Sequence, residues 1–403
     1  MSPKRRTFLK RIGVAGGIAG LAGCSGTQTN TGGGGSDGGD GGGGGTTSGG
    51  GTTSSGTTVG DAGGEELAST LKWLGWDHYA VEDIIKPFEE KYGVTVQGSY
   101  FDANSTAYNK LKTGGTDEFD VVMADGFWPK LYYNEDLVQQ VDYERLQYLD
   151  ALHDTFRSDE FTLFDVDGGK CAVPNCWGGY GVTYNKDKVD KADRSSIESL
   201  LYNEKYDNHI TTSGRHQMNI ANTGVMLGYD DPNGQVWKVC DEKKLDAIKQ
   251  ALIEQKKYLV TRYSSTKNLE RLFKSGQVWA GPEWSGVFRR LYMDGQPYGH
   301  TLLFDEGGLG WVDTWMMTAG VESEAKKNLI YKWINWRLKP ENMAIEAKQV
   351  GWSPCIDIEG MVSDKLYQAL FQDRTEVVNK LTMFDTPSCP GKWEQVWNEM
   401  QSA

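Results

Sequence analysis

The sequence has little histidine and none of the short motifs that mark common hydrolases and metal sites. Its five histidines are scattered, and His209 and His216 lack the i, i+4 spacing that sets two ligands on one helical face. Residues 65–403 hold no GxSxG elbow, no HExxH and no obvious Ser/His/Asp set. The sequence therefore predicts no metal ion, no cofactor and no catalytic residue, and the protein is not expected to be an enzyme.

Basic residues are also fewer than acidic ones: 42 lysines and arginines against 55 aspartates and glutamates give a net charge of −13. Phosphate binding needs clustered basic side chains, so nucleic acid is not expected as a partner. An acidic surface suits solubility in high salt or the neighbourhood of a cationic solute, but it identifies neither.

The N-terminal apolar run, Ile12–Ala22, is too short to cross a bilayer, which needs ~20 apolar residues. It follows Lys4-Arg5-Arg6-Thr7-Phe8-Leu9-Lys10 and ends in Leu21-Ala22-Gly23-Cys24. These flanks resemble a twin-arginine export signal with a lipobox. The resemblance implies that residues 1–24 are a signal peptide, that Cys24 becomes the lipidated first residue, and that the protein is exported and anchored to the outer face of the cell membrane.

Residues 25–64 have the composition of a flexible tether, since 33 of these 40 residues are Gly, Ser or Thr. Such a tract cannot form a core, and a Gly-rich coil of this length spans ~35 Å on average. Its place between an anchor and an ordinary globular region favours a role in holding that region off a surface.

An odd number of cysteines follows Cys24, so they cannot all pair within the chain: Cys171, Cys176, Cys240, Cys355 and Cys389. Export permits disulfides. The pairing stays open, and Cys355 with Cys389 is the first pair to test because both lie in the C-terminal segment. The CxxxxC spacing of Cys171 and Cys176 is not a strong zinc pattern.

Residues 65–403 begin as an alternation of β-prone runs and amphipathic helices. The β-prone runs are Leu71–Trp76, Val94–Tyr100 and Phe119–Ala124. The predicted helices share apolar residues at helical spacing: Val81–Gly93, Ser105–Thr113, Trp128–Tyr133, Asp246–Leu259, Glu324–Leu338, Glu341–Val350 and Lys392–Met400. This alternation predicts an α/β fold with a parallel sheet, in which ligands gather beyond the carboxyl ends of the strands.

Ala172–Tyr184 is predicted as strands around Gly178-Gly179-Tyr180-Gly181. These glycines lack the GxGxxG order of a dinucleotide loop. They are expected to relieve crowding where the chain crosses into a second lobe.

Short strings along this region occur in the order found in one family. They are Leu74–Tyr79, Phe88–Val94, Tyr108–Lys112, Phe119–Met123, Ala172–Pro174, Trp177–Gly178, Tyr184–Asp187, Glu306–Gly308 and Trp311–Asp313. From about Leu71 to Met400 the chain resembles the spermidine/putrescine-type solute-binding proteins of ABC transporters. The resemblance implies a two-lobed periplasmic-binding-protein fold of type II, with hinge-connected α/β lobes at 65–178 with 314–355 and at 179–313 with 356–403. It also implies that the lobes close on a small solute and deliver it to an ABC permease.

The resemblance implies a binding site of carboxylates and aromatic rings, which is the chemistry that a chain of ammonium groups and methylenes requires. The implied ligand-binding residues are Trp76, Tyr79, Asp125, Arg215, Trp284, Trp311, Asp313 and Trp352. Trp352 stands where the family has a tyrosine.

Three positions depart from the family pattern. Arg215 and Met218 stand where acidic residues are expected, and Gly126 stands where an aromatic residue is expected. An arginine ~4 Å from a bound ammonium group costs ~4 kcal/mol at an effective dielectric of 20. Either Asp125 and Asp313 together hold a shorter diamine, or the solute is not a polyamine.

Two alternatives stay open. A sugar-binding protein of the same fold would use tryptophans as stacking faces and Arg215 as a hydroxyl partner. An extracellular hydrolase would use a carboxylate pair such as Asp125 and Asp313. In addition, Asn104-Ser105-Thr106 matches the N-glycosylation pattern that an exported chain can use.

Overall fold

The computed structural model describes residues 58–60, 64–230 and 235–403, all within the unit Thr57–Ala403. The predicted signal peptide, Cys24 and most of the predicted tether lie outside the described residues. Within the range expected as tether, Thr58–Gly60 forms β1, which pairs antiparallel with β2, Glu66–Ala68. The tether prediction is therefore corrected at these three residues.

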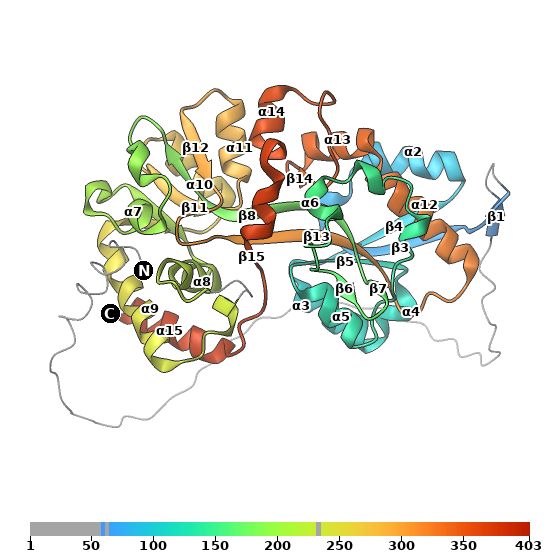
Figure 1. The fold of residues 1–403 in the computed structure, drawn as a ribbon, viewed down its shortest axis with the longest axis horizontal. Coiled ribbons are helices and arrows are strands. Elements are labelled where there is room, and N and C mark those ends of the chain that lie inside the picture. The colour runs from blue at the N-terminus through green and yellow to red at the C-terminus, as the bar shows by residue number, and fades with distance from the viewer. Residues whose placement is uncertain (1–57, 61–63, 231–234) are drawn as a thin grey trace, which may run out of the picture. The chain divides into compact units, whose positions relative to one another are not determined.

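The centre of the unit is one sheet of 11 strands in the order β10-β9-β11-β8-β13-β5-β3-β4, with β12 and β14 also on β8 and β15 on β13 (Figure 1). The strands are β3 (Thr70–Gly75), β4 (Thr95–Tyr100), β5 (Val121–Asp125), β8 (Val173–Asn185), β9 (Ile210–Ser213), β10 (Leu259–Tyr263), β11 (Ala280–Glu283), β12 (Tyr298–Thr301), β13 (Leu309–Met317), β14 (Ser353–Pro354) and β15 (Thr382–Met383).

The pairing of these strands is mixed. β3 pairs in parallel with β4 and with β5, as the βαβ alternation predicted. β13 then adds to β5 in the antiparallel direction and separates it from β8. Ala172–Tyr184, predicted as several strands, is largely one long strand, β8, whose two ends pair with different neighbours.

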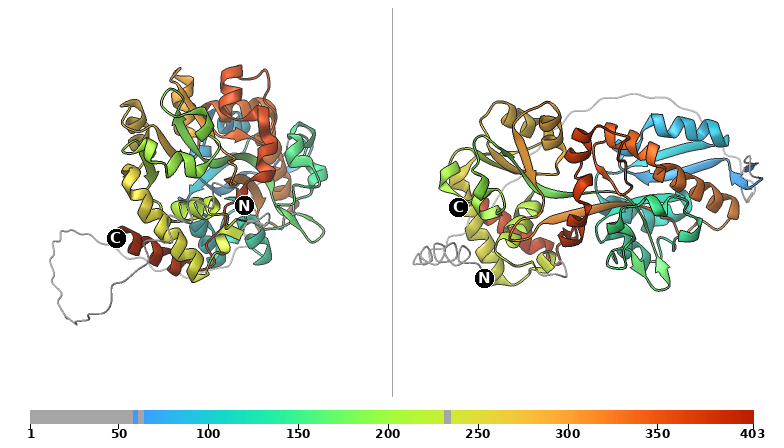
Figure 2. Two further views of the ribbon diagram at one scale, coloured as in Figure 1. Left: turned by 60° about the vertical axis from the view of Figure 1, so that its left-hand side comes forward. Right: turned by 45° about the horizontal axis from the view of Figure 1, so that its top comes forward.

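Helices cover both sides of the sheet: α2 (Glu82–Tyr92), α3 (Asn104–Lys110), α4 (Thr116–Glu118), α5 (Trp128–Asn134), α6 (Asp154–Arg157), α7 (Ile197–Leu201), α8 (His216–Met226), α9 (Glu242–Gln255), α10 (Thr266–Lys274), α11 (Gly286–Met293), α12 (Glu324–Leu338), α13 (Pro340–Gln349), α14 (Asp364–Ala369) and α15 (Pro390–Ser402). Figures 1 and 2 place α2, α12 and α13 on one side of β3 and β5, and α3 and α5 on the other. The predicted helices therefore exist, with ends shifted by a few residues. Among the described residues no helix is long and apolar enough to cross a membrane.

The glycines of β8 relieve crowding, as predicted. A Cβ atom at Gly178 would lie 2.6 Å from Cζ2 of Trp311, and one at Gly181 would lie 2.1 Å from the carbonyl oxygen of Thr301. Any side chain at either position would displace a neighbour.

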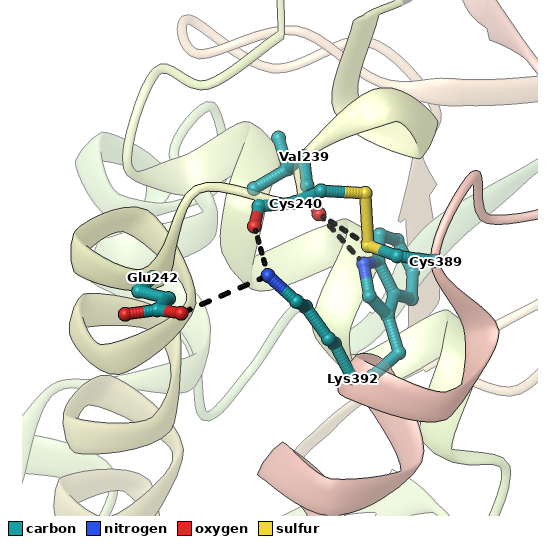
Figure 3. Close-up of a disulfide and its surroundings, with 6 residues drawn as sticks. Val239, Cys240, Glu242, Cys389 and Lys392 are labelled. Carbon is teal, nitrogen blue, oxygen red and sulfur yellow. Dashed lines mark hydrogen bonds and ion pairs between the residues drawn. A yellow bond between two sulfur atoms is a disulfide. The ribbon is translucent and has the colours of Figure 1, made fainter.

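The disulfide joins Cys240 to Cys389, so the expected Cys355–Cys389 pair is wrong. Cys389 precedes α15, which packs against α9, and Cys240 lies just before α9 (Figure 2). Lys392 donates to the carbonyl oxygen of Cys240 at 3.3 Å beside this bond (Figure 3). Cys355 instead lies directly after β14 as a buried free thiol. Its backbone amide donates to the carbonyl oxygen of Asn175 at 2.9 Å. The bond closes a sequence separation of 149 residues, and disulfides that close long loops stabilise by about 2–4 kcal/mol.

Candidate functional site

The strand register places the two predicted carboxylates in one row on one face of the sheet. Asp313 of β13 lies directly opposite Asp125 of β5 on one side and Cys176 of β8 on the other. Directly opposed residues of antiparallel strands point to the same face. Two positions that are 188 residues apart in sequence therefore become neighbours through the insertion of β13 between β5 and β8.

Asp313 is nearly enclosed, with 6% of its surface exposed. The hydroxyl of Tyr79 donates to its Oδ2, and the thiol of Cys176 lies 3.8 Å from the same oxygen and 2.7 Å from the hydroxyl. Burial, followed by the charge of Asp125, raises the pKa of Asp313 well above its ordinary value. The neutral, protonated form of this carboxyl group is therefore favoured until a positive charge comes close to it.

Asp125 is half-buried and is oriented by Asn104 at the start of α3. The Asn104 amide donates to Oδ1 of Asp125, and Tyr132 donates to the carbonyl oxygen of Asn104 at 2.9 Å. Burial raises the pKa of Asp125 to about 6. The amide of the predicted glycosylation acceptor is thus engaged inside the fold.

Neither carboxylate has a counter-ion in the part of the chain that the structure describes. Oδ1 of Asp313 and Oδ2 of Asp125 accept no hydrogen bond there, because the recorded bonds use the other oxygen of each group. Opposed carboxylates without a cation repel each other, and a positive ligand removes that repulsion.

Tyr79 donates to Asp313, and the three other predicted aromatic residues of this group connect to Tyr79 through ring contacts that include His78. The ring of Trp311 lies over Gly178 and meets Trp352 edge-on, with 5.3 Å between ring centroids. Trp76 lies 6.2 Å from Tyr79 by the same measure. These rings come from the loop after β3, from β13 and from the turn before β14, so the structure brings together residues from distant parts of the chain.

Trp284 belongs to a neighbouring aromatic group. Its ring centroid lies 5.1 Å from that of Tyr180 and 4.9 Å from that of Phe384. Tyr180 shares a face of β8 with Cys176 and Gly178, since alternate residues of a strand point the same way. The two aromatic groups therefore follow one another along β8.

Arg215 lies at the Tyr180 end of this row, exposed, just before α8. Its amide and the hydroxyl of Tyr180 both donate to Oγ of Ser213, at 3.3 and 3.1 Å. Met218 is buried within α8 and contributes to packing. The two positions that depart from the family pattern thus differ, because only Arg215 is available to a solute.

The sequence reasoning missed Cys176, Asn104, Tyr180 and Phe384. Cys176 and Tyr180 were detectable, since they alternate with Gly178 on a strand that was predicted. Phe384 had no local signal. Its carbonyl oxygen accepts from the amide of Phe127 at 3.1 Å, and it occupies the space that a side chain at Gly126 would need. This contact explains why glycine stands where an aromatic residue was expected.

A shallow hollow of about 480 Å³ is lined by His78, whose ring contacts those of Trp76 and Trp352, but by none of the predicted site residues. Its lining includes Asp77, His78, Glu82 and Asp83 at the start of α2. Three carboxylates at one rim make the approach to Trp76 electronegative, which favours the arrival of cations.

The comparisons with known proteins agree with this architecture. Residues 83–359 match the family model described as bacterial extracellular solute-binding protein. The spermidine/putrescine-binding periplasmic protein of Escherichia coli is 23% identical over 340 residues, which cover 83% of this chain and 92% of that protein. A protein of the same description from Haemophilus influenzae is 26% identical over 266 residues, 65% of this chain and 69% of its own.

The structural likeness extends over the same region. A substrate-binding protein of a spermidine/putrescine ABC transporter from Streptococcus pneumoniae superposes with a TM-score of 0.67, covering 83% of this chain and 99% of its own at 20% identity. The fold is therefore the two-lobed α/β fold of periplasmic binding proteins, as the sequence predicted. The lobe boundaries stay a prediction.

Proposed function

Because residues 83–359 place this chain in the family of bacterial extracellular solute-binding proteins, we propose that it is the solute-binding component of an ABC importer and captures a small solute bearing an ammonium group. Putrescine and spermidine are the first candidates, since the relatives named above bind them by description. In this proposal the protein is not an enzyme, and its protein partner is an ABC permease.

The observation that carries the proposal is the pair of opposed carboxyl groups, Asp125 and Asp313, which form no ion pair with any described residue and share their face of the sheet with Trp311. An ammonium group between them would satisfy their free oxygens, and the faces of Trp311 and Trp352 suit both the cation and its methylene stem. A neutral sugar would stack on the same rings but would leave the two carboxylates uncompensated.

Calorimetry with putrescine, spermidine, betaine, thiamine and simple sugars tests the proposal. At least one cation is expected to release or absorb heat on binding, and its affinity should fall as the pH drops through about 6, where Asp125 takes up a proton. The sign follows because a protonated, neutral carboxyl group loses its attraction for a cation.

The control is Asp125→Asn, which keeps the size of the side chain. This variant should bind more weakly at pH 8 and show a flatter pH profile between 5 and 7. Heat from a sugar with none from any cation would contradict the charge of the ligand, and a wild-type affinity that does not change with pH would remove Asp125 from the site.

The proposal also includes the anchor and tether. Export through the twin-arginine route and lipidation of Cys24 would hold the binding domain at the outer face of the membrane, with residues 25–57 as the link. A Cys24→Ser chain is expected to lose incorporated radioactive palmitate and to leave the membrane fraction. Equal labelling of both chains would contradict the anchor, and Cys171→Ser serves as the matched control.

A further inference from the structure

A small hollow of about 100 Å³ lies between the end of α2, the side of α12 and the loop at residues 147–148. Its chemistry is opposite to that of the acidic hollow at the start of α2. The residues that line it form a lysine pocket of three lysines, three aromatic residues and two amides: Lys91, Lys332, Lys339, Tyr92, Tyr148, Trp336, Gln147 and Asn335. None of these described residues is acidic, although the chain as a whole has a net charge of −13.

Two of the lining residues are fixed by hydrogen bonds within the fold. Asn335 is buried, accepts from the amide of Gln147 at 2.6 Å and donates to the carbonyl oxygen of Arg145 at 2.9 Å. The indole of Trp336 donates to the carbonyl oxygen of Ile84 at 2.9 Å, which ties α12 to α2. The walls of the lysine pocket are therefore held in place, and a ligand would meet the lysines.

The three lysines differ in how their charge is balanced. Lys332 pairs with Glu65 at 2.7 Å, and Lys339 pairs with Glu341 at 3.5 Å. Lys91 is exposed and forms no ion pair with any described residue. A lysine in the last turn of a helix offsets the negative end of the helix dipole, but this effect is worth little at an exposed site. The uncompensated positive charge of the pocket therefore belongs mainly to Lys91.

Aromatic rings flank this uncompensated charge. The ammonium group of Lys91 lies 5.1 Å from the ring centroid of Tyr92 and 5.2 Å from that of Trp336. Tryptophan and tyrosine rings are enriched at the boundary between a membrane and water, where they lie at the level of the headgroups. Lysines near such a surface are attracted to anionic lipids. The lysine pocket thus combines the side chains that favour contact with phosphate headgroups.

The lysine pocket lies where the chain enters the folded unit. Glu65, the partner of Lys332, immediately precedes β2, and Asn328 of α12 donates to the carbonyl oxygen of Glu66 at 3.1 Å. β1 pairs with β2 and begins at Thr58, directly after the proposed link. Figures 1 and 2 show β1 at the same end of the unit as α2 and α12, and opposite α9 and α15. A membrane anchor would therefore be attached at the end of the unit that carries the lysine pocket.

We propose that the lysine pocket docks the domain on the phosphate headgroups of the anionic membrane to which the chain is anchored. This inference rests on the anchor in the proposed function and adds a second, non-covalent contact with the membrane. A weak contact suffices, because a flexible link keeps the domain at a high effective concentration beside the surface. The acidic remainder of the protein opposes docking only within about 10 Å of the headgroups, since salt at 0.1 M screens more distant charges.

Docking would leave the acidic hollow clear of the membrane. Asp77, Glu82 and Asp83 lie at or before the start of α2, whereas Lys91 and Tyr92 lie at its end. α2 has 11 residues, which separate its two ends by ~15 Å. This distance exceeds the screening length, so a cationic solute can approach the acidic hollow while the lysine pocket contacts the headgroups.

Vesicle binding tests the proposal. A chain of residues 25–403 lacks the predicted signal peptide and the lipid but keeps the whole unit Thr57–Ala403. It is mixed at 0.1 M salt with vesicles of phosphatidylglycerol or of phosphatidylcholine. Its partition coefficient is expected to be at least about fivefold higher on the anionic vesicles, which is the contribution of one lysine near a charged surface. This preference should disappear at 1 M salt, where the Debye length is about 3 Å.

Lys91→Gln should lower partition on phosphatidylglycerol about fivefold. The replacement leaves no carboxylate without a partner among the described residues, so the fold should not change. Lys267→Gln is the matched control, because it removes the same charge from an exposed position on α10. This control should change partition by less than about twofold, since its charge lies away from the docked surface.

Equal partition on the two kinds of vesicle, or an equal loss in Lys91→Gln and Lys267→Gln, would overturn the docking proposal. Heat from inorganic phosphate without any vesicle binding would also overturn it, because the pocket would then hold a small anion only. Solute calorimetry and palmitate labelling are measured separately and do not depend on Lys91. A failure of docking is therefore distinguishable from a failure of the proposed function.

Discussion

Replacing Asp313 by asparagine is expected to lower the affinity for the ammonium-bearing solute about 100-fold, which corresponds to ~2.7 kcal/mol. The reason is that the ammonium group loses a charge-assisted partner at a site where burial has already removed water. Asparagine keeps an oxygen that accepts from Tyr79, so the surrounding geometry should persist. Calorimetry at pH 8 measures the loss.

The same substitution should not destabilise the protein. The folded-state pKa of Asp313 is raised, so the folded chain binds more protons than the unfolded chain over that interval. The free energy of unfolding therefore falls as pH rises toward the folded-state pKa. Asp313→Asn removes this decline, and its unfolding midpoint in urea at pH 8 should equal or exceed that of the wild type.

Asp305→Asn is the matched control for both measurements. Asp305 is exposed, and it accepts from the hydroxyl of Ser195 at 3.1 Å. Its replacement should leave affinity and stability within experimental error. Unchanged affinity in Asp313→Asn would exclude this carboxylate as a ligand, and a large loss of stability would show that it is a structural group.

Arg337→Met is expected to lower the free energy of unfolding by about 3–5 kcal/mol, because it leaves the buried carboxylate of Glu346 without its partner. Arg337 is fully enclosed in α12, donates to Glu346 and to the carbonyl oxygen of Tyr79, and lies over the ring of Trp315 at 5.1 Å. Urea unfolding with an unchanged m value measures the loss.

A double variant sharpens this prediction. Arg337→Met with Glu346→Met removes both charges and should recover most of the lost stability, since a buried ion pair can be replaced by apolar side chains at little cost. Arg157→Met, which breaks an exposed pair with Asp154, should cost less than about 1 kcal/mol. A double variant no more stable than Arg337→Met alone would show that the two charges are not coupled.

Local periodicity predicted the early part of the fold well. The strands β3, β4 and β5 and the helices between them follow from patterns within a few residues of each other, and their observed bounds differ from the predicted ones by a few positions. The position of β13 between β5 and β8 could not be predicted from local patterns. β13 is supplied by a segment more than 180 residues after β5, and hydrophobic patterning contains no information about such a partner.

The site shows the same division. The resemblance carried by short strings predicted Trp76, Tyr79, Trp311, Asp313 and Trp352 as site residues. The structure connects Trp76 with Tyr79, Tyr79 with Asp313, and Trp311 with Trp352, and their role in binding stays a prediction. The disulfide partner of Cys389 and the contact of Phe384 with the Gly126 turn depend on packing between distant segments, so no spacing in the sequence could reveal them.

The position of β13 between β5 and β8 also fixes when the protein can finish folding. Both strands flanking β13 are synthesised long before it, and β14, which pairs with β8 as well, emerges later still. During translation the two early strands must therefore wait, each with an unpaired edge, until nearly the whole chain has left the ribosome. An export route that unfolds proteins would expose those strand edges a second time, when the chain refolds after transport. The N-terminal sequence resembles a twin-arginine signal, and the twin-arginine route carries folded proteins. It would let this late-closing sheet form once, inside the cell, before the chain crosses the membrane.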